Sequence, residues 1–260
     1  MAFERLVPGT AEWGAYMGNH LSRYCFAVEL LAGRPGPLNV LDAACGVGYG
    51  TAHLAQRLPA DVLGVDLSEE ALMIARERFA GPRIDYENDD CQKLAAAAKR
   101  APFDAIVSFE TVEHLPDPGA LMRRCFELLK PNGVLIASTP NVTASPHTAN
   151  WDAHEHAFRA SDYRDLVGNA GFQRVEMYGQ EWTPIGRLRA AVRAELNGVR
   201  SNPFQRVGRW LQRNLRGRKA ERPVLPEDLD DFTVTQIASD AVCEAAGLRG
   251  PFVLIAVATP

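Results

Sequence analysis

The sequence lacks several features that would assign it to a membrane or a secreted class. No segment reaches the ~18 consecutive apolar residues of a membrane-spanning helix. The N-terminus has neither the basic start nor the apolar run of a signal peptide. Five cysteines, an odd number, are scattered without a zinc-ligand spacing. We therefore expect free thiols, a reducing cytoplasm and, from 260 residues with 47% apolar content, one domain plus an appendage.

Charge is distributed unevenly along the chain. The net charge is −4, but residues 187–222 contain eleven Arg and Lys and only two Glu. This segment therefore carries +9 and the rest of the chain −13. The pattern indicates an acidic body with one basic arm.

Apolar runs of strand length alternate with helical patterns between residues 37 and 180. Such alternation predicts an α/β fold, in which a parallel sheet is covered by helices on both faces. Residues 1–36 are expected to form an N-terminal helical cap, with a helix over 10–32. Residues 37–180 form the predicted core, 181–250 a basic helical insertion, and 251–260 a final core strand. No internal repeat or long low-complexity tract is present.

Acidic residues follow four of the predicted strands. They are Asp42, Asp66, Asp90 and Glu110. In a doubly wound sheet, ligands bind beyond the carboxyl ends of the strands. The small-residue loop 43–50 follows the first strand, and its glycines let the backbone bend sharply and approach a ligand. A carboxylate at position 42 would repel a pyrophosphate, so it favours a ligand with an amino group over a dinucleotide.

The strand, acid and glycine-rich loop at 40–50, together with Asp66, resemble the class I S-adenosylmethionine (SAM)-dependent methyltransferases. The resemblance implies a seven-stranded Rossmann-like sheet whose last strand is antiparallel, with SAM as the cofactor. It departs at Ala44, where the family usually has glycine; alanine is tolerated there unless the backbone needs a positive φ.

The resemblance also implies roles for single residues. Asp42 would face the methionine amino group or cap the turn, and Asp66 would accept both ribose hydroxyls or act only as a loop acid. Asp90, rather than Asp89, would accept from the adenine amino group. Arg23, on an N-terminal helix that closes over the cofactor, would pair with the methionine carboxylate. The full set expected to bind SAM is Tyr16, His20, Arg23, Asp42, Ala44, Cys45, Gly46, Gly48, Asp66, Leu67, Asp90, Cys91, Phe109 and Glu110.

Segments 109–116 and 129–141 resemble small-molecule methyltransferases such as the ubiquinone-biosynthesis O-methyltransferases. Methyl transfer to a hydroxyl needs alignment and a base near neutral pKa, for which histidine is the usual residue. His114, His147, His154 and His156 are candidates. The resemblance singles out His154, four residues before a phenylalanine, and we expect His154, His114 and Glu113 to be the catalytic residues.

Two alternatives remain for this segment. Asp152, His154, Glu155 and His156 are ordinary metal ligands, although methyl transfer does not require a metal and no complete ligand set is evident. The histidines could equally be hydrogen-bonded surface residues.

The insertion before the last strand contains an amphipathic basic stretch over residues 204–216. It could pack on the body or on a second subunit of a homodimer, or contact an anionic membrane surface or a lipid-linked substrate through 187–222. A net acidic chain argues against nucleic acid as a partner.

We therefore expect a SAM-dependent methyltransferase that acts on an oxygen of a small molecule, sugar or lipid-linked saccharide. It would be cytoplasmic, either free or peripheral at the inner membrane face. The alternatives are N-methylation of an amino sugar or other small amine, and a SAM-binding partner subunit without catalysis. Base N-methylation of the Asn-Pro-Pro-Phe/Tyr type is disfavoured, because residues 109–112 read Phe-Glu-Thr-Val.

Overall fold

The computed structural model describes residues 11–144, 154–184, 231–237 and 251–260, with side chains from residue 18 onward. The strands are β1 (Leu38–Ala43), β2 (Ala60–Asp66), β3 (Ile84–Asn88), β4 (Phe103–Phe109), β5 (Leu129–Pro140), β6 (Arg174–Trp182), β7 (Phe232–Gln236) and β8 (Val253–Thr259). The helices are α1 (Ala11–Leu31), α2 (Tyr49–Arg57), α3 (Glu69–Arg78), α4 (Pro118–Leu128) and α5 (Ala160–Gly168), with short 3-10 turns η1 (Ala97–Arg100) and η2 (Val112–His114).

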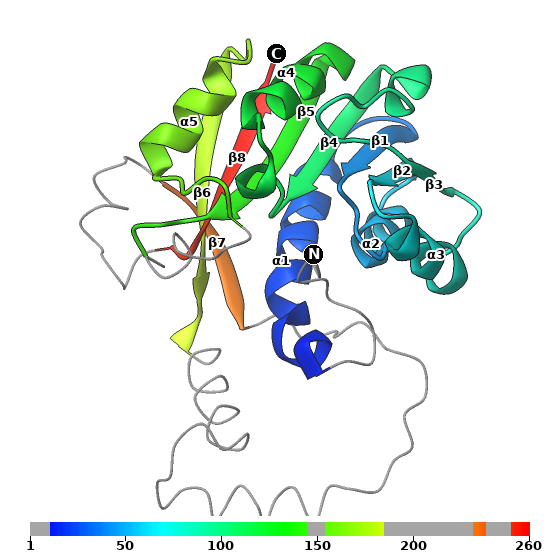
Figure 1. Cartoon of the computed structure of the whole chain (residues 1–260), viewed down its shortest axis with the longest axis horizontal. Helices are drawn as coiled ribbons and strands as arrows, with labels where there is room; N and C mark the ends of the chain where they lie inside the picture. Colours follow the sequence, from blue (N-terminus) through cyan, green and yellow to red (C-terminus); the bar gives the residue numbers. More distant parts are fainter. Residues whose placement is uncertain (1–10, 145–153, 185–230, 238–250) are drawn as a thin grey trace, which may run out of the picture.

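All strands belong to one sheet in the order β3-β2-β1-β4-β5-β8-β6-β7 (Figure 1). β1 to β5 are parallel. β8 lies antiparallel between β5 and β6, so β6 again runs in the direction of β5. The predicted α/β sheet with an antiparallel last strand is confirmed. The carboxyl ends of β1, β2, β4, β5 and β6 consequently meet at one edge.

The sheet has one strand more than the seven expected. β7 pairs antiparallel with the outer side of β6 and comes from within 181–250, which was expected to be helical. Its side chains alternate in exposure, as is usual in an edge strand. The basic segment 187–222 lies outside the described residues.

A second difference concerns residues 130–133, which were expected to form a turn before the fifth strand. They belong to β5, where the pairing with β4 is interrupted: Phe103 pairs with Leu129, and the next pair is Ala105 with Val134. The Lys-Pro-Asn-Gly residues therefore form an irregularity inside the strand.

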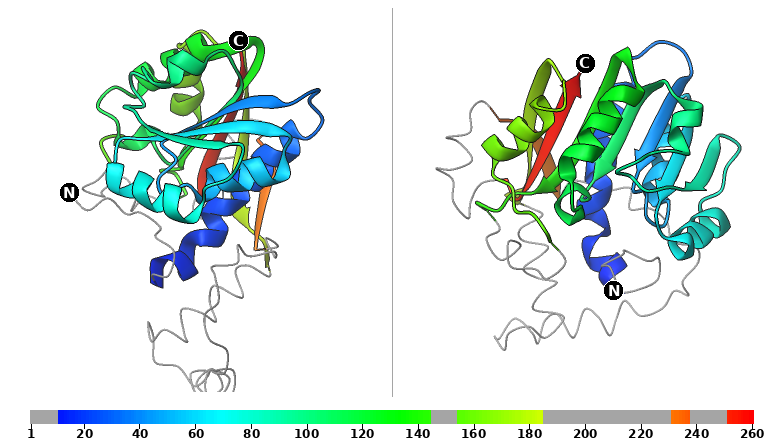
Figure 2. Two further views of the ribbon diagram at one scale, coloured as in Figure 1. Left: turned by 90° about the vertical axis from the view of Figure 1, so that its right-hand side faces the viewer. Right: turned by 45° about the horizontal axis from the view of Figure 1, so that its top comes forward.

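Helices cover both faces of the sheet, as the two views in Figure 2 show. On one face, α4 and α5 pack on alternate strand residues such as Leu41 and Ile106. On the other face, α1, α2 and the start of α3 pack on Val40, Val107 and their neighbours. Successive residues of one strand thus enter opposite cores, which explains why the strands read as continuous apolar runs.

Two further findings concern the described ranges alone. None of their helices combines the length and the apolar character that crossing a bilayer demands. Cys25, Cys45, Cys91 and Cys125 are free thiols, and Cys243 lies outside these ranges.

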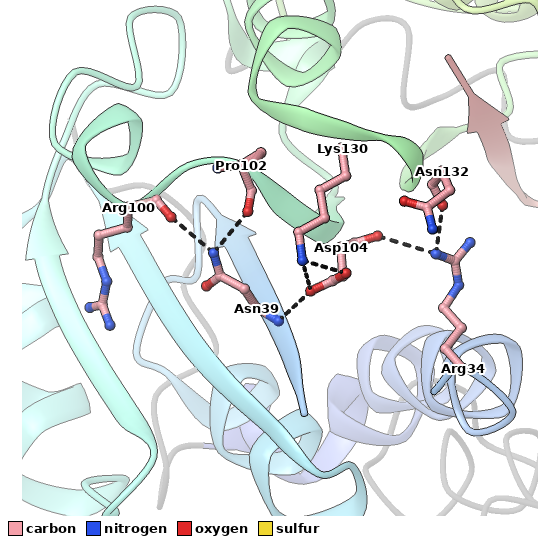
Figure 3. Close-up of polar contacts among 7 residues, drawn as sticks. All are labelled: Arg34, Asn39, Arg100, Pro102, Asp104, Lys130 and Asn132. Carbon is pink, nitrogen blue, oxygen red and sulfur yellow. Dashed lines mark hydrogen bonds and ion pairs between the residues drawn. The ribbon is translucent and has the colours of Figure 1, made fainter. Parts of the chain in front are cut away.

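Asp104 joins three elements at the amino edge of the sheet, opposite the acids described above (Figure 3). Its carboxylate accepts the backbone N–H of Asn39 at 2.8 Å and the Lys130 ammonium at 2.8 and 2.9 Å. Arg34 donates to the Asn132 carbonyl at 2.9 Å. Partial burial raises the pKa of Asp104, but the hydrogen bonds from Asn39 and Lys130 outweigh it and hold the pKa below its usual value.

We expect Asp104→Asn to lower the free energy of unfolding at pH 7 by about 1–2 kcal/mol, because it removes charge-assisted hydrogen bonds. A carboxyl whose pKa is lowered by folding stabilises above its unfolded value of about 4, and that contribution is lost as the pH falls through the folded value. The difference in the free energy of unfolding between the variant and the parent should therefore shrink below about pH 4. Urea unfolding of both proteins at several pH values measures this difference. Asp85→Asn, in an exposed pair with Arg100, should change stability by less than about 0.5 kcal/mol; equal losses in both variants would contradict the role of Asp104.

Candidate active site

Asp42 at the end of β1 is fully buried. Its carboxylate accepts hydrogen bonds from the Thr51 hydroxyl at 2.7 Å and the Tyr24 hydroxyl at 3.2 Å. Burial raises the pKa of Asp42 to about 7, although both hydrogen bonds act in the opposite direction. Asp42 therefore ties α1 and α2 to the first strand, and its contact with a methionine amino group stays a prediction.

The loop after β1 contains three residues in left-handed backbone conformations. Gly46 has φ 57° and Gly48 has φ 85°, and a Cβ on Gly48 would lie 2.6 Å from the Tyr86 hydroxyl. Ala44 has φ 66°, so the position where the family usually has glycine does need a positive φ. A non-glycine residue there costs about 1–2 kcal/mol. Strain of this kind concentrates at functional sites.

Asp66 at the end of β2 supports the same loop. Its carboxylate accepts the backbone N–H of Gly46 at 2.9 Å and of Ser68 at 2.8 Å. A carboxylate can accept further hydrogen bonds, so these contacts leave room for the predicted ribose hydroxyls. The next side chain, Leu67, is 70% exposed beside this buried loop, where it could cover a flat ring.

The two acidic residues after β3, Asp89 and Asp90, differ in burial and in their partners. Asp89 is buried, and its carboxylate accepts the backbone N–H groups of Ala95, Ala96 and Ala97. It therefore caps the turn that leads into η1. Asp90 is more exposed, with Lys93 at 3.0 Å, and its position beyond β3 is consistent with the predicted role at adenine. Cys91 is partly buried.

Glu110 follows β4 with φ 52°, a second strained position near the carboxyl edge. The Ser138 hydroxyl on β5 donates to the Glu110 carboxylate at 2.9 Å. The Glu110 backbone N–H donates to the Ser138 carbonyl at 3.2 Å. The preceding residue, Phe109, is buried and meets the Tyr24 ring edge-on, with centroids 4.9 Å apart.

Glu113 in η2 is a buried carboxyl. The Thr139 hydroxyl donates to its Oε2 at 3.2 Å, while Oε1 has no hydrogen-bond partner among the described residues. Burial raises the pKa of Glu113 well above its usual value, and the nearby charge of Glu110 raises it further. Two acids, Glu110 just after β4 and Glu113 within η2, therefore lie close together.

The structure brings together the three residues expected to be catalytic. The His114 Nε2 atom lies 3.9 Å from Glu113 Oε1, and the His114 and His154 rings meet edge-on with centroids 4.8 Å apart. One ligand atom from each of Glu113, His114 and His154 lies within 4.8 Å of the others. These residues can therefore act on a proton or hold a metal ion.

The segment 154–158 is attached to η2 through its backbone. The N–H groups of Glu155 and His156 donate to the Glu113 carbonyl at 2.8 and 3.1 Å. His156 has a buried Nε2 without a partner among the described residues, whereas the Glu155 side chain is exposed. Among the described residues, His154 forms a possible ligand group with Glu113 and His114, while the metal alternative that groups His154 with residues 152, 155 and 156 stays a prediction. His147 and Asp152 lie outside the described residues.

Arg23 on α1 is fully buried. Its Nη1 donates to Gln180 Oε1 at 2.9 Å and to Asn19 Oδ1 at 3.2 Å. Its Nε and Nη2 are buried, and no described residue accepts from them. The neighbouring His20 has a pKa well below its usual value, because burial and then the Arg23 charge disfavour its protonation. The Tyr16 side chain lies outside the description.

Sequence reasoning did not identify Gln180, Asn19, Tyr24 or Thr51 as part of this site. The strand that ends at Trp182 contains several polar and charged residues, so the sequence carried no signal that distinguished Gln180 from the others.

Comparison with known proteins agrees with this geometry. Residues 40–133 match the family model described as a methyltransferase domain. A probable S-adenosylmethionine-dependent methyltransferase of Mycolicibacterium smegmatis is 34% identical over 179 residues, which are 68% of this chain and 66% of that protein. A ubiquinone biosynthesis O-methyltransferase of Xanthomonas axonopodis pv. citri is 33% identical over 180 residues, 63% of this chain and 74% of that protein. The chain belongs to the SAM-dependent methyltransferases.

Solved structures show the same fold. A SAM-dependent methyltransferase from Archaeoglobus fulgidus superposes with a TM-score of 0.57 at 19% identity, covering 93% of this chain and 94% of that one. A Haemonchus contortus phosphoethanolamine N-methyltransferase 2 in complex with S-adenosyl-L-methionine gives a TM-score of 0.58 at 18% identity, over 92% of this chain and 52% of that one.

The methyltransferase site offers groups that fit SAM. The free Nε and Nη2 donors of buried Arg23 suit a carboxylate. The left-handed loop at 44–48 leaves backbone groups close to the carboxyl edge. SAM supplies an electrophilic methyl group on a sulfonium, so the chain has to position the acceptor and remove its proton.

The raised pKa of Asp42 makes cofactor binding depend on pH. If the ligand ammonium interacts with this carboxylate, binding must lower its pKa from about 7 and release a proton. The affinity for S-adenosylhomocysteine (SAH) should then rise by up to about tenfold between pH 6 and pH 8. Calorimetry in buffers of different ionisation enthalpy measures both effects.

Asp42→Asn is the control for that experiment, because Glu113 also has a raised pKa. The variant should bind SAH with little pH dependence between pH 6 and 8. A parent protein that releases no proton at pH 7 would show that Asp42 only caps the turn after β1.

Proposed function

We propose that this methyltransferase transfers a methyl group to an oxygen of a small molecule, sugar or lipid-linked saccharide, with His154 as the general base. The observation that carries the proposal is the cluster of Glu113, His114 and His154 near the carboxyl edge. The names of relatives such as the ubiquinone biosynthesis O-methyltransferases support oxygen as the acceptor atom.

In the proposed reaction His154 takes the proton of the acceptor hydroxyl. The His114 ring packs against the His154 ring and restricts its orientation. Glu113 Oε1 lies 3.9 Å from His114 Nε2, and ligand atoms of Glu113, His114 and His154 all lie within 4.8 Å of one another. The Glu113 carboxyl can therefore hold a proton or stabilise a protonated imidazole of either histidine.

The cofactor is proposed to lie across the carboxyl ends of β1 to β4. Arg23 binds its carboxylate, Asp66 its ribose and Asp90 its adenine. Asp89 is already used by three backbone N–H groups, which supports Asp90 as the adenine contact. The proposal includes a homodimer, or a contact of residues 187–222 with a membrane surface or a lipid-linked substrate.

We expect His154→Ala to lower kcat by about 10²–10⁴-fold, the usual contribution of a general base, while SAH affinity changes less than about twofold. Steady-state kinetics and calorimetry measure the two quantities. His53→Gln removes a histidine that contacts Cys25 at 3.3 Å, away from this cluster, and should leave kcat unchanged. Full activity in His154→Ala would move the base elsewhere or favour an amine acceptor, which needs no such base.

A separate experiment tests whether His114 and His154 bind a metal ion instead of acting on protons. A chelator should leave activity unchanged if the histidines act on protons. If activity is lost and then restored by a divalent ion, His114 and His154 are ligands instead, and the base proposal fails.

The acceptor class is testable with methyl-labelled SAM and an extract of the native host. We expect label in the small-molecule, lipid or polysaccharide fraction after fractionation. Label in lipid or polysaccharide would support a lipid-linked or saccharide acceptor. Label in protein or RNA alone would contradict the proposal, and the carbon-13 chemical shift of a ¹³C-labelled methyl group distinguishes O-methyl from N-methyl products.

A further inference from the structure

Gln180 is a buried amide near the carboxyl end of β6, and it contacts the N-terminal helix. The side chain is fully buried, although 157 residues separate it from Arg23 in the sequence. Its Nε2 donates to the Asn19 carbonyl at 2.9 Å, to Asn19 Oδ1 at 3.0 Å and to the Ser22 hydroxyl at 2.5 Å. Its Oε1 is therefore fixed in direction and accepts from Arg23 Nη1 at 2.9 Å.

These contacts leave one edge of the guanidinium available. Nη1 is bound by the amide oxygens of Gln180 and Asn19, while Nε and Nη2 are buried without a partner among the described residues. In a planar guanidinium, Nε and Nη2 present two parallel N–H groups, which match the two oxygens of a carboxylate.

The residues that hold Nη1 are neutral. A buried guanidinium is expensive unless it is paired, and a carboxylate at either position would pair with it permanently. Neutral amides fix the side chain and leave its charge for a ligand. A Glu at 180 would fit the same volume and still accept from Nη1, but it would neutralise Arg23.

We propose that Gln180, together with Asn19, positions Arg23 through neutral amide oxygens and so keeps its charge and its Nε–Nη2 edge for the cofactor's carboxylate. Gln180 is a positioning residue, because it acts through Arg23. The inference rests on the proposed role of Arg23 and deepens it, since it places part of the cofactor's recognition on β6.

The test compares two ligands that differ only in the carboxylate. SAH carries it, and S-adenosyl-3-thiopropylamine is the same molecule without it. The readout is the ratio of their dissociation constants, measured by calorimetry on the full chain. We expect the parent to favour SAH by at least about tenfold, the free-energy equivalent of about 1.4 kcal/mol.

Gln180→Glu should reduce this preference about tenfold by neutralising Arg23, and Gln180→Leu should reduce it several-fold by releasing Nη1. Affinity for the decarboxylated ligand should not change in either variant. Gln236→Glu makes the same substitution at an exposed position of the neighbouring β7 and should leave the ratio unchanged. If Gln180→Glu does not fold, Asn19→Asp puts a carboxylate against the same Nη1 from a less buried position and should lower the ratio likewise.

Arg23→Gln separates the two levels of the proposal. One outcome is that the ratio of the two dissociation constants falls to about one in Arg23→Gln, while the Gln180 and Asn19 variants keep the parental ratio. Arg23 then binds the carboxylate but needs no positioning, and the present inference is wrong. If Arg23→Gln itself keeps the parental ratio, the proposed role of Arg23 fails. Equal weakening of both ligands in the Gln180 variants would mean a structural role only and would also overturn the inference.

Discussion

The close packing of Tyr24 against Gly50 is the constraint on which the candidate site depends. A Cβ on Gly50 would lie 1.9 Å from the Tyr24 ring, so α1 can reach the start of α2 only because this residue is glycine. From this position the Tyr24 hydroxyl meets Asp42, and its ring packs on Phe109 and Tyr49. One aromatic side chain thus fixes α1 against β1, β4 and α2. Arg23, its neighbour in sequence, is brought to the carboxyl edge by the same packing.

Most of the core could be predicted because its signals are local. Strands buried on both faces read as continuous apolar runs. Ser68, a residue type that favours helix starts, caps α3 by accepting from the Ala71 N–H at 3.3 Å. The acids at the strand ends were predictable for the same reason, since parallel strands bring their carboxyl ends to one edge. The proximity of Glu113, His114 and His154 followed from the family resemblance of two separate segments.

The features that were not predicted depend on contacts distant in sequence. β7 is a short edge strand that pairs with β6. Its sequence, Phe-Thr-Val-Thr-Gln, does alternate apolar and polar side chains, but the pattern is only five residues long and lies inside a segment that was expected to be helical. The Lys-Pro-Asn-Gly residues resemble a turn, yet Lys130 is held by Asp104 of the neighbouring strand and stays in β5. The conformation of Ala44 also could not be predicted, because alanine adopts a positive φ only when the surrounding structure imposes it. Gln180 became recognisable only when β6 and α1 were placed side by side.

The order of the strands has a consequence for synthesis of the chain. In the described sheet, β6 and β7 connect to β1–β5 only through β8, which comes last in the sequence. During translation β1 to β5 can pair with one another as they emerge. β6 pairs with none of them, and β8, which joins β6 to β5, is complete only when residue 259 has left the ribosome. The pairing with β8 then fixes Gln180 of β6 beside Arg23. A chain synthesised or truncated before β8 would thus hold an assembled glycine loop, whereas the strand that carries Gln180 would still lack the partner that joins it to β5.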